Sequence, residues 1–196
     1  KATTGDLAVG THVRDHATEL LGAAWGFAAD RLSARWPVHE DGAVRPIDWR
    51  TPAVVLGSAG AFGLLAARWT DPLDLAVLGL YVAALIVLLA TDLDQKLLPD
   101  LITFPLMAYA LLLLVTGLNP VLAGKSQVLV ADGDVAALLA AIAAPALLAV
   151  TDRIFRGALG MGDLKLAVSL GLMFGVTQLF VGFLVGTLAF ASVVLV

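Results

Sequence analysis

Long stretches without a charged side chain follow one another along this chain, and short polar segments separate them. A helix needs about 20 mostly apolar residues to cross the hydrocarbon core of a bilayer. Because unpaired backbone groups cannot face lipid, such stretches predict an all-α, polytopic bundle of membrane helices. The four clearest stretches lie at residues 53–67, 75–90, 101–116 and 135–150.

The last apolar run, residues 166–196, is too long for one ordinary membrane helix. Gly175 and Gln178 lie near its middle, where we expect the helix to be interrupted. The run then predicts a short helix over about 163–176 and a full one over about 178–196. It reaches the last residue of the sequence, so we expect the chain to continue beyond Val196.

The N-terminal part is less apolar than the rest. Leu20–Ala29 is a short apolar stretch with charged neighbours, which predicts a marginal span or an interfacial helix. We therefore expect six to seven transmembrane helices. The chain divides into an N-terminal segment over 1–35, a cytoplasmic loop over 36–51 and a membrane core over 52–196.

Three glycines repeat at a three-residue spacing inside the first clear stretch, Gly57, Gly60 and Gly63. Small residues let membrane helices approach each other closely. We therefore expect this face to pack against a neighbouring helix.

Composition supports a membrane setting and excludes several kinds of site. Hydrophobic residues make up 60% of the chain and charged residues 14%, whereas a soluble domain carries about 25% charged residues. The lipid bilayer is the expected partner, and the net charge of −4 argues against nucleic acid. The chain has no cysteine, which excludes disulfides, thiolate zinc sites and cysteine nucleophiles. We predict no metal site, because the histidines show no ligand spacing: His12, His16 and His39.

Basic residues predict the orientation. Eight of the twelve lie in the segments near 31–50, 92–99 and 151–165, which share one side if these segments join alternate spans. Loops rich in Lys and Arg tend to remain in the cytoplasm. We expect this side to be cytoplasmic.

Two acidic motifs stand at the borders of apolar stretches. The first, Thr91–Asp100, holds Asp92, Asp94, Pro99 and Asp100; the second, Gly160–Lys165, holds Gly160, Gly162, Asp163 and Lys165. By position alone, the acidic residues of the first motif could be solvated loop residues, with Asp100 as a helix cap.

The number of spans between the motifs changes that interpretation. Two predicted spans separate Asp92 from Asp163, and two crossings return the chain to the side it left. Two carboxylates that meet at a partly desolvated site can share one proton, so that one acts as base and the other as acid. The base takes a proton from water, which attacks a peptide carbonyl, and the acid protonates the leaving amine. This chemistry needs neither a metal nor a cofactor.

The glycines of the second motif suit such a site. Gly160 and Gly162 lack a Cβ, so a substrate backbone can approach Asp163 closely. Asp163 is expected to open a helix, where the helix dipole attracts negative charge. Lys165 could contact the substrate or could simply extend toward the interface.

The pattern Asp-x6-Pro-Asp at one span end and Gly-x-Gly-Asp-x-Lys at a later helix start resembles the type IV prepilin peptidases. The resemblance covers about residues 52–196. It implies that Asp92 and Asp163 are the catalytic aspartates. It gives supporting places to Asp94, Pro99, Asp100, Gly160, Gly162 and Lys165.

The resemblance also implies a function. The enzyme would be a multi-pass protein of the bacterial inner membrane, cleaving the leader of a prepilin or pseudopilin precursor at the cytoplasmic boundary, for type IV pili or protein secretion. The family can also methylate the new N-terminus with S-adenosylmethionine. This chain lacks the four zinc-binding cysteines of the family's cytoplasmic loop, so we do not expect methyl transfer or that cofactor.

Three other interpretations stay open. Asp92, Asp94 and Asp163 could hold Mg²⁺ in a membrane transferase. Membrane acids and prolines also suit a small proton-coupled transporter. A presenilin-like protease shares Gly-x-Gly-Asp, although its first motif is Tyr-Asp and Thr91 precedes Asp92 here. The sequence names neither the physiological substrate nor the oligomeric state.

Overall fold

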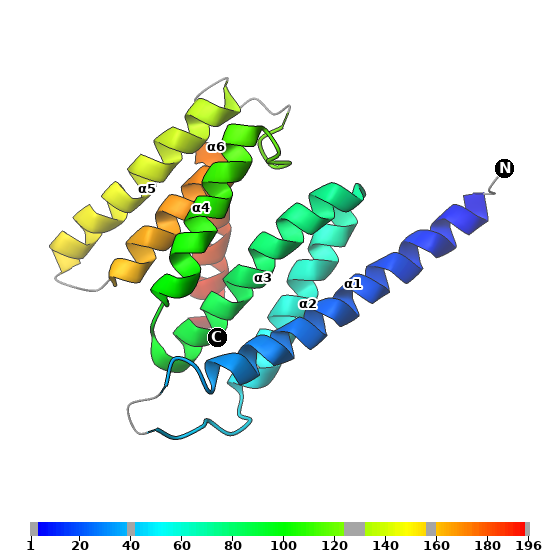
Figure 1. The fold of residues 1–196 in the computed structure, drawn as a ribbon, viewed down its shortest axis with the longest axis horizontal. Helices are drawn as coiled ribbons and strands as arrows, with labels where there is room; N and C mark the ends of the chain where they lie inside the picture. The colour runs from blue at the N-terminus through cyan, green and yellow to red at the C-terminus, as the bar shows by residue number, and fades with distance from the viewer. Residues whose placement is uncertain (1–3, 39–41, 124–131, 156–159, 195–196) are drawn as a thin grey trace. The chain divides into compact units, whose positions relative to one another are not determined.

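The computed structural model describes residues 4–38, 42–123, 132–155 and 160–194. These residues form six helices and no strand, which confirms the all-α class for the described part of the chain (Figure 1). The helices are α1 (Thr4–Ser33), α2 (Arg50–Arg68), α3 (Pro72–Gln95), α4 (Asp100–Thr116), α5 (Gly133–Phe155) and α6 (Met161–Val194).

Four of these helices are long and apolar enough to cross a membrane. They are α2, α3, α5 and α6. The apolar helix α4 is shorter, with 17 residues, and α1 is not among the four. The expected count of six to seven spans is therefore confirmed only in part.

The chain divides into two compact units, Lys1–Ile102 and Thr103–Val196. The first motif ends close to this division and the second lies within the second unit. The three-part division expected from the sequence stays a prediction.

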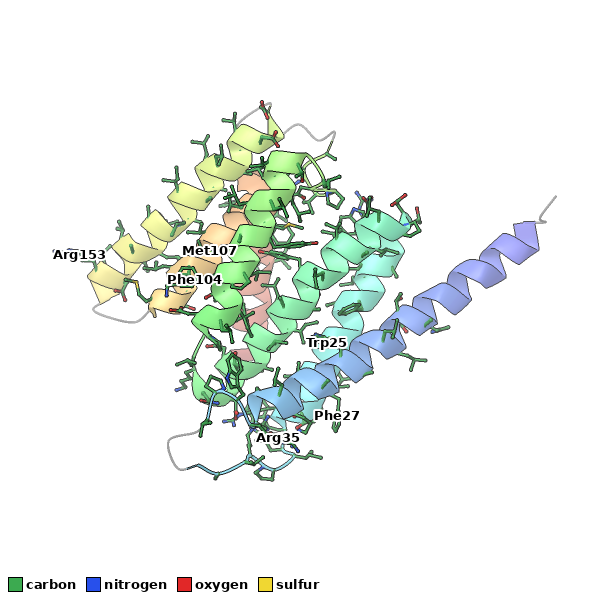
Figure 2. All side chains as sticks on the ribbon, viewed as in Figure 1. Trp25, Phe27, Arg35, Phe104, Met107 and Arg153 are labelled. Carbon is green, nitrogen blue, oxygen red and sulfur yellow. The ribbon has the colours of Figure 1, made fainter. Side chains whose placement is uncertain are left out.

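In the first unit, α1 lies directly against α2 at two glycines of α1. A Cβ at Gly26 would lie 2.7 Å from the Cβ of Ser58, and Ser58 Oγ donates a hydrogen bond of 2.6 Å to the carbonyl of Gly22. Trp25, between them, donates from Nε1 to the carbonyl of Ala83 in α3 at 3.0 Å (Figure 2). These contacts join α1 and α2 to each other and to α3, the helix whose last turn begins the first motif.

Two of the three α2 glycines that were expected to pack against a neighbouring helix do not do so. A Cβ at Gly57 or Gly60 would meet nothing within 4 Å, and one at Gly63 would meet only the side chain of Glu19. The expectation was wrong for Gly57 and Gly60. Gly22 and Gly26 of α1 instead permit the close approach of α1 to α2. The α2 residues opposite them include Val54 and Ser58.

In the second unit, α5 and α6 run side by side (Figure 1). They approach most closely at Gly171, where a Cβ would lie 2.6 Å from the backbone carbon of Ala140 and from Cα of Ala141. A backbone cannot move aside as a side chain can. Only glycine fits this crossing.

The expected interruption of the last helix is confirmed at Gly175, whose φ of 67° and ψ of −178° are not helical. In a continuous helix, the carbonyl of Met173 would accept from the backbone N–H four residues later. Here the side chain of Asn119 donates to that carbonyl at 2.9 Å, while its oxygen accepts from the N–H of Val121 at 3.0 Å. Asn119 is buried, with both ends of its amide paired, and it joins the turn after α4 to the break.

Candidate active site

Asp163 is held at the start of α6 by a local pair of hydrogen bonds. Its Oδ2 accepts from the N–H of Gly160 at 3.0 Å, and its own N–H donates to the carbonyl of Gly160 at 3.1 Å. The first bond is one half of a capping box, in which an acidic residue of the first turn satisfies an otherwise unpaired N–H, and the second is a backbone bond. The carboxylate is half-buried at a helix N-terminus, as the sequence predicts.

Gly160 and Lys165 of the second motif make contacts of different kinds. A Cβ at Gly160 would lie 3.6 Å from Oδ2 of Asp163, which is an ordinary contact. The second unit by itself therefore does not require a glycine there. Nζ of Lys165 lies 4.7 Å from the centre of the Phe104 ring, within the range of a cation–π contact. Lys165 thus contacts the N-terminal part of α4.

Asp92 lies in the last turn of α3 with an exposed side chain. Its carbonyl accepts from the N–H of Lys96 at 2.8 Å, and Lys96 ends the helix in the left-handed conformation at φ 53°. Pro99 is buried, and Asp100 is the exposed first residue of α4.

Asp94 is in the opposite situation from Asp92. Only 2% of its side chain is exposed, and Oδ1 lies 2.7 Å from Nε of Arg45 and 3.1 Å from Nη1 of Arg50. Nε of Arg45 makes no hydrogen bond, so its contact with Asp94 is an ion pair. Asp94 therefore belongs to a charged cluster at the end of α3 and not to an open site.

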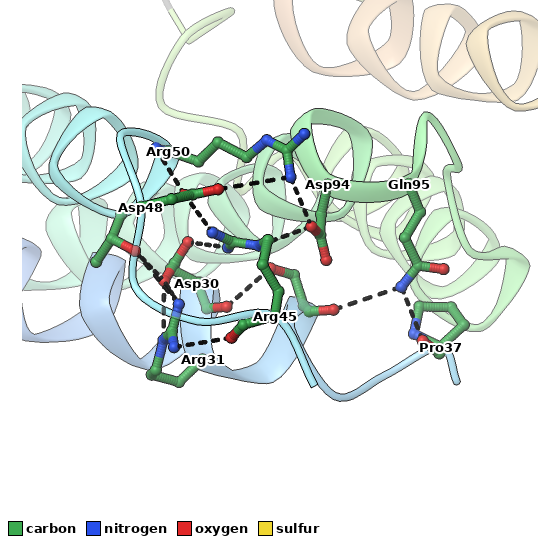
Figure 3. A network of polar contacts seen from close by, with 10 residues as sticks. Asp30, Arg31, Pro37, Arg45, Asp48, Arg50, Asp94 and Gln95 are labelled. Carbon is green, nitrogen blue, oxygen red and sulfur yellow. Dashed lines mark hydrogen bonds and ion pairs between the residues drawn. The ribbon is translucent and has the colours of Figure 1, made fainter. Parts of the chain in front are cut away.

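This cluster joins α1, the loop before α2, and α3 (Figure 3). Asp30 binds Arg31 and Thr51 through Oδ2 and Arg45 through Oδ1. Arg45 also binds Asp48. We call the set the charged cluster; its members are Asp30, Arg31, Arg45, Asp48, Arg50, Thr51 and Asp94.

The two predicted catalytic residues lie in different units, Asp92 in the first and Asp163 in the second. The structure gives the surroundings of each within its own unit. It brings Asp163 together with Gly160, and Asp94 together with two arginines.

A family model for the type IV leader peptidase family matches residues 79–195, more than half of the chain. The chain belongs to this family. The matched range contains both aspartate motifs, Asp92–Asp100 and Gly160–Lys165, and leaves out α1, the loop and α2. No curated protein and no solved structure matches the chain significantly.

Membership confirms the family resemblance seen in the motifs and identifies the protein as a peptidase of a membrane family. The four apolar helices fit a multi-pass membrane protein. The match thus agrees with the expected class of enzyme and with the expected setting.

The charged cluster was not predicted from the sequence. Its arginines indicated only the cytoplasmic side. One signal was present: Arg45 in the loop and Arg50 at the start of α2 flank Asp48, and a polar segment with paired charges often holds ion pairs. Nothing in the sequence pointed from that loop to Asp94.

The charged cluster predicts sensitivity to acid. Burial favours a raised pKa for Asp30, but the hydrogen bonds from Arg31, Arg45 and Thr51 outweigh burial and lower the pKa from its ordinary value of 3.8. Asp30 lies at the end of α1, outside the four candidate spans. A carboxyl group whose pKa is lower in the folded state stabilises the fold above the ordinary value and loses that contribution as the pH falls below it.

Thermal unfolding in detergent should therefore show a loss of stability that begins as the pH falls below about 4 and grows as the pH is lowered further. The loss should be smaller in Asp30→Asn, which has no carboxyl group to protonate at that position. An equal loss in both proteins would show that Asp30 does not contribute.

Proposed function

We propose that this protein is an aspartic endopeptidase that removes the leader of a prepilin or pseudopilin precursor, with Asp92 and Asp163 as the catalytic pair. The observation that carries the proposal is the family match over residues 79–195, which contains both motifs. The proposed place is the bacterial inner membrane, with the site at the cytoplasmic face, where the basic residues predict it.

The proposed reaction divides proton transfers between the two carboxyl groups. One takes a proton from water as the water oxygen bonds to the scissile carbonyl carbon. The other gives its proton to the leaving nitrogen as the carbon–nitrogen bond breaks. The hydrogen bond from Gly160 to Asp163 supports this assignment, because a catalytic carboxylate needs a fixed orientation.

A contact inside the second unit supports a meeting of the two motifs. Phe104 follows Asp100 of the first motif by four residues, and its ring receives Lys165 of the second motif. The chain that leaves the first motif therefore reaches the second motif. We propose that this arrangement extends to Asp92 and Asp163 themselves.

The surroundings of Asp94 argue against a magnesium-dependent transferase. Such a site would need the carboxylate of Asp94, which is buried and whose Oδ1 is paired with both Arg45 and Arg50. We propose that proteolysis uses no metal and no cofactor. S-adenosylmethionine would be required only by methyl transfer, which we do not propose for this chain.

The absence of a metal requirement is testable. Cleavage should be unchanged, within about twofold, after incubation with EDTA, because proton transfer between two carboxyl groups uses no metal. The rate of precursor cleavage measures this. Loss of activity that Mg²⁺ restores would favour the transferase type of site instead.

The function itself is tested by reconstitution. The full-length protein is incorporated into liposomes together with a pilin precursor, and the products are identified by mass spectrometry. We expect a single cut that separates the basic leader from the apolar helix. Proton flux across the liposome membrane without cleavage would favour a transporter.

A further inference from the structure

The last turn of α3 presents its two aspartates in opposite directions. Successive residues of an α-helix are about 100° apart, so positions 92 and 94 point to nearly opposite sides. The structure agrees, since Asp92 is exposed and Asp94 is buried in the charged cluster. The contacts that fix the side chain of Asp94 therefore also determine the direction in which the side chain of Asp92 points.

Arg45 is the residue that links Asp94 to the other carboxylates of the charged cluster. Its side chain is 8% exposed and contacts carboxylates from three elements: Asp30 at the end of α1, Asp48 in the loop and Asp94 in α3. A buried arginine is stable only when it is paired. The cluster contains three arginines and three aspartates, so its charges balance.

A hydrogen bond from Gln95 also fixes the last turn of α3. The side-chain amide of Gln95 donates to the carbonyl of Pro37 at 2.7 Å, just after α1 (Figure 3). Helix ends fray readily when only local bonds hold them. The turn that carries Asp92 is fixed at Asp94 by an ion pair and at Gln95 by a hydrogen bond.

We propose that Arg45 is a positioning residue for the reaction: through Asp94, it holds the last turn of α3 against the loop and so directs Asp92 toward the substrate. The inference rests on the proposed catalytic role of Asp92. Arg45 touches neither the reacting atoms nor Asp92, and it acts only by fixing the backbone that carries Asp92. Orientation of this kind matters because a displacement of about 1 Å can cost about 100-fold in rate.

The test uses the full-length protein in liposomes and compares wild type, Arg45→Gln, Arg45→Lys, Asp94→Asn and the double variant Arg45→Gln/Asp94→Asn. Arg35→Gln is the matched control, because Arg35 lies in the segment after α1 and its side chain is exposed (Figure 2). The chain has no cysteine, so Leu97→Cys supplies a unique position for a nitroxide label beside the end of α3. The label reports motion of this segment without reference to activity.

We expect Arg45→Gln to lower kcat by about 100-fold, with KM within about threefold of wild type, because the substrate contacts remain. The label at position 97 should become more mobile. The effects of Asp94→Asn and Arg45→Gln should be less than additive in the double variant, since both changes break the Arg45–Asp94 ion pair. Arg45→Lys should lose less, about 10-fold, because it keeps the positive charge, although an ammonium cannot bridge three carboxylates as a guanidinium does.

The failures are distinguishable. If wild type and Arg35→Gln cleave the precursor and folded Arg45→Gln matches them in kcat, the positioning role is overturned and the proposed function stands. If wild type itself does not cleave, the proposed function is overturned, and the role of Arg45 with it. Should Arg45→Gln fail to fold, Arg45→Lys decides: a lower kcat at unchanged KM supports the inference, and a wild-type kcat overturns it.

Discussion

Asp92→Asn and Asp163→Asn should each lower kcat for precursor cleavage by about 10³-fold or more, while the protein still inserts and folds. Each substitution keeps the size of the side chain but removes a group that must gain or lose a proton. General acid–base catalysis contributes about 10² to 10⁴-fold, and the two groups act as a unit. The double variant should therefore be hardly slower than either single variant.

The matched control is the same substitution at the other end of α3. Asp71 caps the first turn, with Oδ1 accepting from the N–H of Leu73 at 2.8 Å. Asparagine caps a helix about as well as aspartate. Asp71→Asn should keep the wild-type rate, and turnover by Asp163→Asn at that same rate would refute the proposed mechanism.

Gly171→Val should destabilise the second unit by about 3 kcal/mol or more, because its side chain would overlap the backbone of α5. The added Cβ would lie 2.6 Å from two backbone atoms of Ala140 and Ala141, so α5 and α6 would have to separate. Thermal unfolding in detergent, together with the fraction of monodisperse protein on gel filtration, measures the loss.

Gly182 provides the control inside the same helix. A Cβ there would meet nothing within 4 Å, so Gly182→Val should leave the unfolding temperature nearly unchanged. Equal destabilisation by the two variants would mean that valine disturbs α6 itself rather than its contact with α5.

These glycines show how far the sequence leads. Apolar length predicted the helices, and Gly175 and Gln178 in the middle of an overlong apolar run predicted the break, because both are local properties of a chain in lipid. Which glycine permits a close approach is not local. Gly57 and Gly60 were the expected contacts, yet Gly22 and Gly26 make them, since the requirement depends on what lies opposite in space.

The candidate site shows the same limit. The spacing of the two motifs identified Asp92 and Asp163 and led to the family that the comparison then found. The partners of Asp94 could not be predicted from the sequence. Arg45 precedes Asp94 by 49 positions, and no periodicity links a loop residue to a helix end. The pairing follows from how α1, the loop and α3 pack.

The charged cluster has a consequence for the conditions under which the loop stays folded. In the described part of the chain, the contacts that tie the loop to α3 are made by guanidinium, carboxylate and amide groups. Thiolates are oxidised by peroxide and exchange with disulfides, and a metal held by thiolates is released when they react. Guanidinium and carboxylate groups undergo neither reaction. We therefore expect this anchoring to persist under oxidative stress and under shortage of zinc, two conditions that would open a loop held by a metal–thiolate centre.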